Sequence, residues 1–169
     1  ITRHLRVSQA VNNPFQICIF DDSIGVRLSP YQLTRPCATI PTGFYNLVQK
    51  LMDYVPDVPI SIICQKNHEQ LLTERFPKMP INSLNKSLPT LYINGRCSLT
   101  RNHLNELING INSEKNYLFI NTKHVIGVFA NMDLNETAFH LLRNAPTFEQ
   151  IVEGIRQQCI VEEKRFVFL

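Results

Sequence analysis

The feature that most constrains the fold is an alternation of two kinds of segment along the chain. Short, continuous apolar runs are typical of strands that are buried on both faces of a sheet, and such runs occupy residues 17–20, 60–64 and 91–93. Stretches with apolar residues at helical spacing lie at residues 43–55, about 68–76, after Thr100, about 136–143 and 147–158. This alternation predicts an α/β fold of Rossmann-like type, with a mostly parallel sheet and helices on both faces.

Local signals refine the expected elements. The helix over residues 43–55 is expected to place Phe44 on its apolar stripe, and Asn67, Thr100 and Thr147 are predicted N-caps of later helices. Residues 117–120 and 124–130 are predicted to form two strands joined by a hairpin-like turn. The last segment, 160–169, is predicted to be a strand interrupted by the charged residues 162–165. Its apolar end is expected to pair with a sheet edge or with another chain.

Length and charge limit the kind of protein. With 169 residues, the chain is expected to form one domain, over residues 17–169, preceded by a tail or linker at 1–16. The net charge of +3 is mild and no dense basic stripe is present, which argues against nucleic acid as a partner. No apolar run approaches the roughly 20 residues that a membrane span requires. Because the first residue is Ile1 rather than Met, we expect a piece of a longer protein.

The cysteines indicate a compartment. There are five, an odd number, and they are widely spaced without a C-x-x-C pair. This pattern argues against a structural zinc site and favours free thiols in a reducing compartment. We therefore expect a cytoplasmic protein.

Two loops are candidates for the functional site, because ligands of open α/β sheets bind beyond the carboxyl ends of the strands. The first loop spans residues 21–42 and contains Asp21, Asp22, Gly25, Arg27 and Arg35. Two arginines near a glycine suit phosphate recognition, but the arginines could equally be surface side chains or partners of the two aspartates. The paired aspartates could bind Mg²⁺ or simply belong to a turn.

The second loop, residues 94–100, begins with Asn94, Gly95 and Arg96. Asn-Gly favours a tight turn, and Arg96 could hold an anion or be a solvated turn residue. The sequence contains no Walker P-loop, no G-x-G-x-x-G and no G-x-S-x-G. The five histidines show no metal-ligand spacing, and no residue is assigned as a metal ligand.

These loops resemble the motifs of sugar nucleotidyltransferases. Residues 27–30 (Arg-Leu-Ser-Pro), 34–36 (Thr-Arg-Pro) and 37–43 are similar to the opening motif of that family. A narrower group, related to N-acetylglucosamine-1-phosphate uridyltransferase, is resembled by residues 17–22 (Ile-Cys-Ile-Phe-Asp-Asp), by 33–36 (Leu-Thr-Arg-Pro) with Gly43, and by 92–96 (Tyr-Ile-Asn-Gly-Arg). The resemblance covers residues 17 to about 130 and implies the nucleotide-diphospho-sugar transferase fold.

The resemblance also implies roles for the loop residues. In the family the first loop cradles the nucleotide, an arginine contacts phosphate, a lysine assists transfer, and an aspartate of the second loop holds Mg²⁺. In this chain Cys37 stands in place of the lysine and Arg96 in place of the aspartate. Because catalysis of nucleotidyl transfer depends on fixed cations around the reacting phosphate, these changes predict weakened, altered or absent transferase activity.

Three functions remain open at this point. The first is transfer of a nucleotidyl group to a sugar 1-phosphate, with Arg27, Arg35 and Arg96 as phosphate clamps, Arg27 and Arg35 as the catalytic residues, and Mg²⁺ as a candidate cofactor of the active domain. In that case Asp21, Asp22, Gly25, Asn94, Gly95 and Arg96 would form the substrate-binding site. The second is a catalytically degenerate module, a pseudoenzyme, that binds a nucleotide sugar or sugar phosphate, or supports a partner domain. The third is a protein-interaction domain without a ligand. The resemblance further implies a C-terminal acyltransferase-type domain in a longer chain, and a homo-oligomer is a further expectation.

Overall fold

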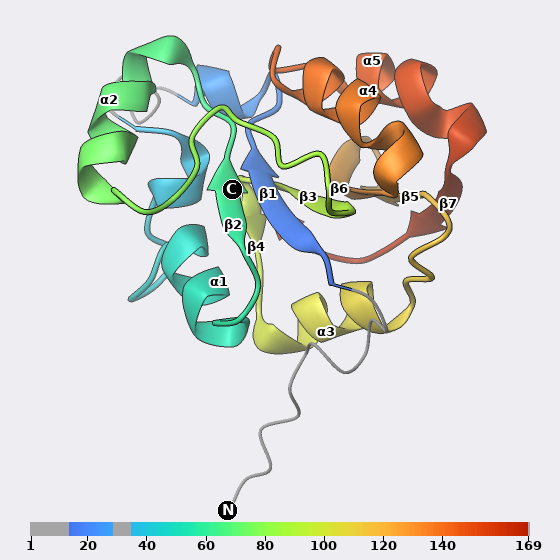
Figure 1. Ribbon diagram of the computed structural model, residues 1–169, viewed down its shortest axis with the longest axis horizontal. Coiled ribbons are helices and arrows are strands. Elements are labelled where there is room, and N and C mark those ends of the chain that lie inside the picture. The colour runs from blue at the N-terminus through green and yellow to red at the C-terminus, as the bar shows by residue number, and fades with distance from the viewer. Residues whose placement is uncertain (1–13, 29–34, 169) are drawn as a thin grey trace, which may run out of the picture.

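The computed structural model describes residues 14–28 and 35–168, and its centre is a six-stranded sheet. The strands lie in the order β2-β1-β3-β6-β5-β7 (Figure 1). Their bounds are β1 Gln16–Phe20, β2 Ile60–Ile62, β3 Thr90–Asn94, β5 Tyr117–Asn121, β6 His124–Ala130 and β7 Ile160–Glu163. β1 pairs in parallel with β2 and β3, and β5 pairs in parallel with β7, whereas β6 is antiparallel to both of its neighbours. The prediction of a mostly parallel sheet is confirmed, and so is the hairpin of β5 and β6.

Helices cover both faces of this sheet, as the alternating pattern predicted. On one face, buried residues of α1 (Leu47–Tyr54), α2 (Lys66–Arg75) and α3 (Arg101–Asn109) pack on the sheet. On the other face, α4 (Met132–Leu142) and α5 (Phe148–Ile155) pack on Cys18, Phe20 and Tyr92. Alternate residues of β1 therefore belong to different cores, which explains why the strand sequence is apolar throughout.

The predicted starts of the first two helices are wrong. α1 begins at Leu47 rather than near residue 43, because Asn46 forms a capping box with Gln49. Phe44 is consequently outside the helix and fully exposed, and Gly43 has a φ of 94°, which a helix cannot contain. α2 begins at Lys66 after the N-cap position Gln65, so Asn67 lies inside the helix and does not cap it.

The later helices agree better with the sequence. Thr100 and Thr147 cap α3 and α5 as predicted, each accepting a hydrogen bond from the third helical residue. α4 begins four residues earlier than predicted, because Asn131 caps it through the backbone N–H groups of Asp133 and Leu134. Short 3₁₀ turns lie at Gly25–Arg27, Cys37–Thr39 and Arg156–Gln158. Within the described part of the chain, no helix is long and apolar enough to cross a membrane.

The C-terminal segment forms two strands rather than one interrupted strand. β7 extends the main sheet, whereas β8 (Val167–Phe168) pairs antiparallel with β4 (Cys97–Ser98) in a separate two-stranded sheet. The expectation that the apolar end pairs with a strand is thus met within the chain itself, and Leu169 lies outside the described residues. The pairing brings the end of the chain to the segment that follows β3.

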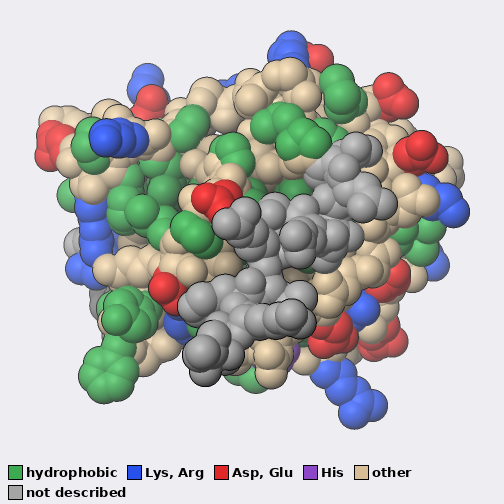
Figure 2. All heavy atoms as spheres, turned by 60° about the horizontal axis from the view of Figure 1, so that its bottom comes forward, with side chains coloured by type: hydrophobic (Ala, Val, Ile, Leu, Met, Phe, Trp, Pro, Cys, Tyr) green, Lys and Arg blue, Asp and Glu red, His purple; other side chains and the backbone are tan. Residues whose placement is uncertain are grey.

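At the start of the domain, Phe15 is buried in the core and the Gln16 side chain donates hydrogen bonds to the carbonyl of Asn85 and the hydroxyl of Thr90. Phe15 and Gln16 therefore belong to the packed part of the chain. On the face shown in Figure 2, Lys and Arg side chains are scattered rather than gathered into a stripe.

Candidate functional site

The candidate site lies where β1 and β3 end. These strands are parallel neighbours, and their last residues, Phe20 and Asn94, are paired in register. Asp21 and Asp22 therefore leave the sheet beside Gly95 and Arg96, although about 74 residues separate them in sequence. The structure thus brings the two predicted loops together at one edge of the sheet, as the rule for open α/β sheets requires.

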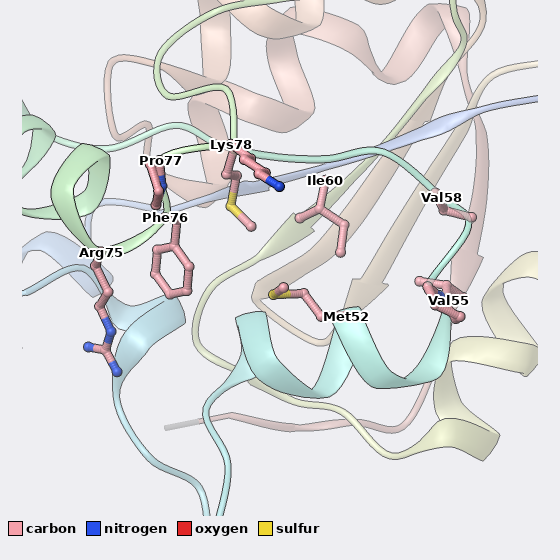
Figure 3. A pocket seen from close by; sticks show the side chains of 10 residues that line it. Met52, Val55, Val58, Ile60, Arg75, Phe76, Pro77 and Lys78 are labelled. Carbon is pink, nitrogen blue, oxygen red and sulfur yellow. The ribbon is translucent and has the colours of Figure 1, made fainter.

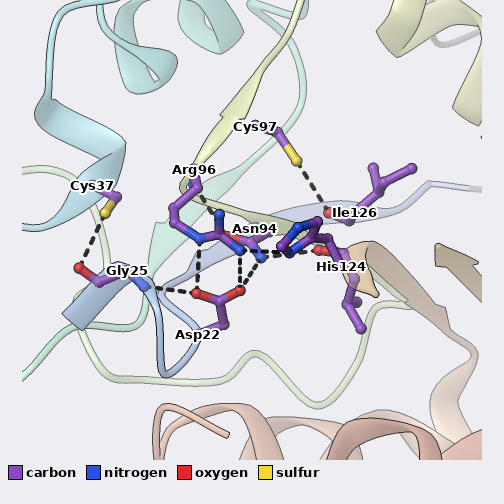
Figure 4. Close-up of polar contacts among 9 residues, drawn as sticks. Asp22, Gly25, Cys37, Asn94, Arg96, Cys97, His124 and Ile126 are labelled. Carbon is purple, nitrogen blue, oxygen red and sulfur yellow. Dashed lines mark hydrogen bonds and ion pairs between the residues drawn. The ribbon is translucent and has the colours of Figure 1, made fainter. Parts of the chain in front are cut away.

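The centre of the site is a bidentate ion pair between Asp22 and Arg96 (Figure 4). The Nε of Arg96 donates to Oδ1 of Asp22 at 2.9 Å, and its Nη2 donates to Oδ2 at 2.6 Å. Both side chains are buried, with 2% and 8% of their areas exposed. A planar guanidinium matches a carboxylate in this geometry better than any other cation of a protein.

The remaining hydrogen-bonding capacity of Asp22 is filled by neighbouring residues. Its Oδ1 accepts the backbone N–H of Gly25 at 2.8 Å, and its Oδ2 accepts Nδ2 of Asn94 at 2.9 Å. Asn94 also donates to the carbonyl of Val125 and accepts the backbone N–H of Arg96. Four of the predicted site residues (Asp22, Gly25, Asn94 and Arg96) thus form one hydrogen-bonded network in which every oxygen of the carboxylate has two donors.

Two residues that the sequence did not single out as site residues complete this network. Nδ1 of His124, at the start of β6, lies 3.3 Å from Nη2 of Arg96. The ring of Phe168 in β8 lies 5.0 Å from the guanidinium carbon of Arg96 and 4.9 Å from the His124 ring. A cation over an aromatic face is a favourable contact, especially when it is desolvated. No sequence signal could have identified these residues, because their positions depend on the pairing of β8 with β4 and on the path of β6.

The two aspartates have opposite electrostatic properties. Burial by itself raises the pKa of Asp22, but the hydrogen bonds and the charge of Arg96 outweigh burial and hold that pKa below its ordinary value. Burial raises the pKa of Asp21 to about 6, against a weaker opposing effect of the hydrogen bond that its Oδ2 accepts from the backbone N–H of Cys37. The carboxyl group of Asp22 is therefore ionised at neutral pH, whereas the carboxyl group of Asp21 titrates at a pH close to neutral.

A pH dependence of stability follows from Asp21. Because its pKa is higher in the folded state than in the unfolded state, the folded protein binds the proton more tightly, and stability rises as the pH falls through about 6. We expect a gain of about 1 kcal/mol between pH ~7 and ~5, measured by urea unfolding. The lowered pKa of Asp22 has the opposite effect, and its contribution is lost below pH ~4.

The control for this prediction is a pair of substitutions. Asp21→Asn should remove the gain, because the amide does not titrate, whereas Asp57→Asn, at an exposed turn, should keep it. An unchanged gain in Asp21→Asn would show that another group is responsible.

Cys37 takes no part as a nucleophile in this arrangement. The residue is buried, its Sγ donates to the carbonyl of Gly25 at 3.4 Å, and burial strongly raises the pKa of its thiol. A neutral thiol cannot replace the positive charge of the lysine that the family motif has at this position. Its observed contacts hold the Gly25 turn against Asp21 and Asp22.

A glycine is needed at position 95 because the neighbouring atoms leave no room for a side chain, and not because of an unusual backbone angle. A Cβ atom at this position would lie 2.5 Å from Oδ1 of Asp21 and 3.1 Å from the backbone nitrogen of Ala38. The backbone N–H of Gly95 donates to the carbonyl of Phe20 at 2.7 Å. The glycine therefore allows the two loops to approach each other.

The three arginines occupy different environments. Arg96 is buried and paired with Asp22, so the interpretation of Arg96 as a ligand-facing anion binder has to be corrected: its guanidinium is part of the internal network. Arg27 is exposed at the end of the first 3₁₀ turn, and Arg35 is partly buried just before the second. Residues 29–34, which include Thr34 of the family motif, lie outside the described residues. The phosphate-binding roles of Arg27 and Arg35 stay predictions.

The residues at this edge do not fit a magnesium site. Mg²⁺ needs carboxylate oxygens that are free to coordinate it, whereas each oxygen of Asp22 already accepts two hydrogen bonds, one of them from the guanidinium of Arg96. The second carboxylate, Asp21, accepts the backbone N–H of Cys37 through its Oδ2. In the described ranges, no group of three or more His, Cys, Asp or Glu side chains is placed to hold a metal ion.

The fold and the position of the site together define a class: a mixed α/β domain of nucleotidyltransferase type, with its polar site at the carboxyl ends of β1 and β3. The chain belongs to the sugar nucleotidyl transferase family, whose family model matches residues 17–164. The family that the motifs of the two loops predicted is thus confirmed.

A solved structure agrees with this fold, and a second has a lower score. CTP:phosphocholine cytidylyltransferase from Streptococcus pneumoniae superposes with a TM-score of 0.50 at 12% identity, covering 90% of this chain and 91% of that chain. UDP-glucose pyrophosphorylase complexed with UDP-glucose gives a TM-score of 0.45 at 12% identity, covering 90% of this chain and 92% of that chain. No curated protein sequence matches this chain.

Proposed function

We propose that this sugar nucleotidyltransferase domain binds a nucleotide sugar or sugar phosphate without needing Mg²⁺, and that it has lost efficient nucleotidyl transfer. The observation that supports this proposal most directly is the buried Asp22–Arg96 pair. It fills the position where the family motif would supply a metal-binding aspartate. The guanidinium compensates the charge of Asp22 and offers no coordination site, so the pair argues against metal-assisted chemistry and leaves anion binding to the other arginines of the loop.

Arg27 and Arg35 are the residues that we assign to the ligand phosphates. Both lie in the loop between β1 and α1, on the side of the sheet edge where Asp21 and Asp22 emerge. Neither is paired with those aspartates among the described contacts, because the partner of Asp22 is Arg96. Guanidinium groups that are not committed to an internal carboxylate remain available for phosphate oxygens.

The finer identity of the ligand rests on the loop motifs. Residues 19–22 and 92–96 resemble the group related to N-acetylglucosamine-1-phosphate uridyltransferase, and this likeness favours a uridine diphosphate sugar. The same likeness is the basis for expecting a C-terminal acyltransferase-type domain in a longer chain. A cytoplasmic location is consistent with the four buried free cysteines, Cys18, Cys37, Cys64 and Cys97, and with the partly buried free Cys159.

The test is calorimetric titration with UDP-N-acetylglucosamine in buffer with Mg²⁺ and in buffer with EDTA. We expect the same affinity in both buffers. Arg27→Glu and Arg35→Glu should each weaken binding by about tenfold, because each removes a charge-assisted hydrogen bond and adds repulsion. Arg156→Glu, an exposed arginine on a different 3₁₀ turn, is the matched control and should bind as the unmodified protein does.

Transferase activity is tested separately by pyrophosphate release from UTP and N-acetylglucosamine 1-phosphate. We expect no release above background, with or without Mg²⁺. Robust, Mg²⁺-dependent release would overturn the proposal in favour of a working enzyme. Absence of binding for every nucleotide sugar and sugar phosphate would instead favour a protein-interaction domain.

A further inference from the structure

A groove lies at the opposite end of the sheet from the Asp22–Arg96 network. It is bounded by the end of α1, the edge strand β2, and the end of α2 with the turn that follows it (Figure 3). Ile60, the first residue of β2, lies in its wall and pairs with Ile17 at the amino end of β1, whereas the network lies beyond the carboxyl end of β1. The groove has a volume of about 570 Å³, which is within the usual range of ligand sites.

The walls of the groove are mainly apolar and adaptable. Met52 of α1 and Phe76 after α2 point into it from opposite sides in Figure 3, and Met79 contributes a second thioether. Met52 has 49% of its area exposed. Methionine side chains fit varied apolar partners because they are flexible and polarizable.

The edge of β2 offers backbone hydrogen bonds beside this apolar surface. In a parallel ladder, alternate residues of a strand point their N–H and C=O groups to opposite sides. At Ile62 the outward groups are used, because its N–H donates to the carbonyl of Pro80 and its carbonyl accepts the N–H of Asn82. The outward groups of Ile60 share this direction, and no described residue bonds to them. At this edge, residues 80–82 therefore pair with Ile62, while the backbone donor and acceptor of Ile60, a residue that lines the groove, have no partner among the described residues.

Charge is distributed unevenly along the groove. Arg75 and Lys78 are exposed at the α2 end, where the guanidinium of Arg75 lies 5.5 Å from the centre of the Phe76 ring. At the α1 end, the exposed Asp57 lies between the lining residues Pro56 and Val58. A ligand that follows the groove is thus favoured when its negative charge lies at the α2 end.

We propose that this groove is a docking site for an extended peptide segment of a partner protein, with acidic residues at one end and alternating apolar residues after them. The segment adds to the edge of β2 through the backbone of Ile60. Its acidic end faces Arg75 and Lys78, and its apolar side chains pack on Met52 and Phe76. Strand addition of this kind obtains affinity from the main chain and specificity from pockets for alternate side chains.

Other occupants fit the same features less well. The first 13 residues of the chain contain Arg3, His4 and Arg6 but no acidic residue. Their positive charge would be repelled by the positive charge of the α2 end. A small amphiphile would use the apolar walls but not the backbone groups of Ile60. A second copy of the chain offers the edge strand β7, in which exposed Ile160 and Val161 precede two glutamates, and the test below distinguishes it.

The experiment measures fluorescence anisotropy of a labelled peptide, Glu-Glu-Val-Thr-Val-Thr, titrated with the whole chain. We expect saturable binding that weakens at least tenfold when Arg75→Glu and Lys78→Glu are combined, and also when Met52→Asp is introduced. Lys115→Glu, an exposed lysine elsewhere, is the matched control and should not change binding. Thermal unfolding of each variant shows whether the fold is kept.

Matched peptides test the mode of binding. A peptide with Lys-Lys in place of Glu-Glu, and peptides N-methylated at either valine, should bind at least tenfold more weakly if charge and backbone are both recognised. Equal binding of the lysine peptide, or of both methylated peptides, would overturn the proposal. Self-association in sedimentation that Lys78→Glu abolishes would assign the groove to a second copy instead. Affinity for UDP-N-acetylglucosamine should be unaffected by these variants, so this inference and the proposed function fail independently.

Discussion

Arg96→Met is expected to lower the free energy of unfolding by about 3–5 kcal/mol, the cost of leaving a buried charge without its partner. In this variant the carboxylate of Asp22 keeps its donors from Gly25 and Asn94 but loses both hydrogen bonds and the charge of the guanidinium. The pKa of Asp22 should consequently rise, so that the variant is relatively more stable in mild acid. Urea unfolding followed by circular dichroism measures both effects.

A double variant separates the ion pair from packing. Asp22→Asn combined with Arg96→Met removes both charges, and it should be more stable than Arg96→Met alone, because no buried anion remains. Arg101→Met is the matched control on the surface. Arg101 and Asp53 form an ion pair at 3.3 Å with side chains that are 45% and 75% exposed, and such pairs contribute about 0–1 kcal/mol. Equal effects of Arg96→Met and Arg101→Met would contradict our description of the site as a closed network.

The Asp22–Arg96 network also makes it unfavourable to restore the metal-binding aspartate of the family motif by a single substitution. Arg96→Asp would restore the aspartate of the family motif, but it would place two carboxylates together where Asp22 already lacks solvent. Such a pair is unfavourable unless a cation compensates it. The replacement of the family aspartate is thus coupled to the burial of Asp22 and to the contact of Phe168 with Arg96, and this coupling is the basis of the proposed loss of metal-dependent transfer.

The sequence predicted the parts of this structure that depend on local patterns. Continuous apolar runs identified β1, β2 and β3, and threonine caps identified the starts of α3 and α5. The start of α1 was missed because helical spacing continued through Phe44, whereas the capping box of Asn46 and Gln49 decides where the helix begins. Periodicity reports a repeating face, but a helix end is set by the hydrogen bonds of individual residues.

At the site, the sequence predicted which residues take part, but it did not predict which of them contact one another. Asp22, Asn94 and Arg96 were all selected, because the ends of parallel strands meet at one edge. That Arg96 rather than Arg27 or Arg35 pairs with Asp22 depends on the register of β1 with β3. His124 and Phe168 were missed as site residues for the same reason, since their contacts with Arg96 require the paths of β6 and β8 in space.

The path of β6 depends on Gly127, and substitution of this residue is expected to lower the stability of the protein strongly. A Cβ atom on Gly127 would lie 2.3 Å from the carbonyl oxygen of Tyr92 in β3, which is too close for any real contact. The neighbouring register of β6 with β5 is irregular, since Phe119 pairs with Gly127 but Ile120 pairs with Val125. A glycine beside such a bulge allows two backbones to approach closely.

Gly127→Ala is therefore expected to lower the free energy of unfolding by about 3 kcal/mol, because the obstructing atom belongs to a central strand that cannot move away without breaking its pairing. Gly110→Ala is the matched control: its Cβ would meet nothing within 4 Å, and its φ of −87° suits alanine, so the change should be neutral or slightly stabilising. Urea unfolding measures both variants.

The alanine at 127 should also displace β6 from β3 and so loosen the contacts of Val125 with Asn94 and of His124 with Arg96. If Gly127→Ala proved as stable as Gly110→Ala, the close approach of β6 to β3, and with it the described geometry around Arg96, would be wrong.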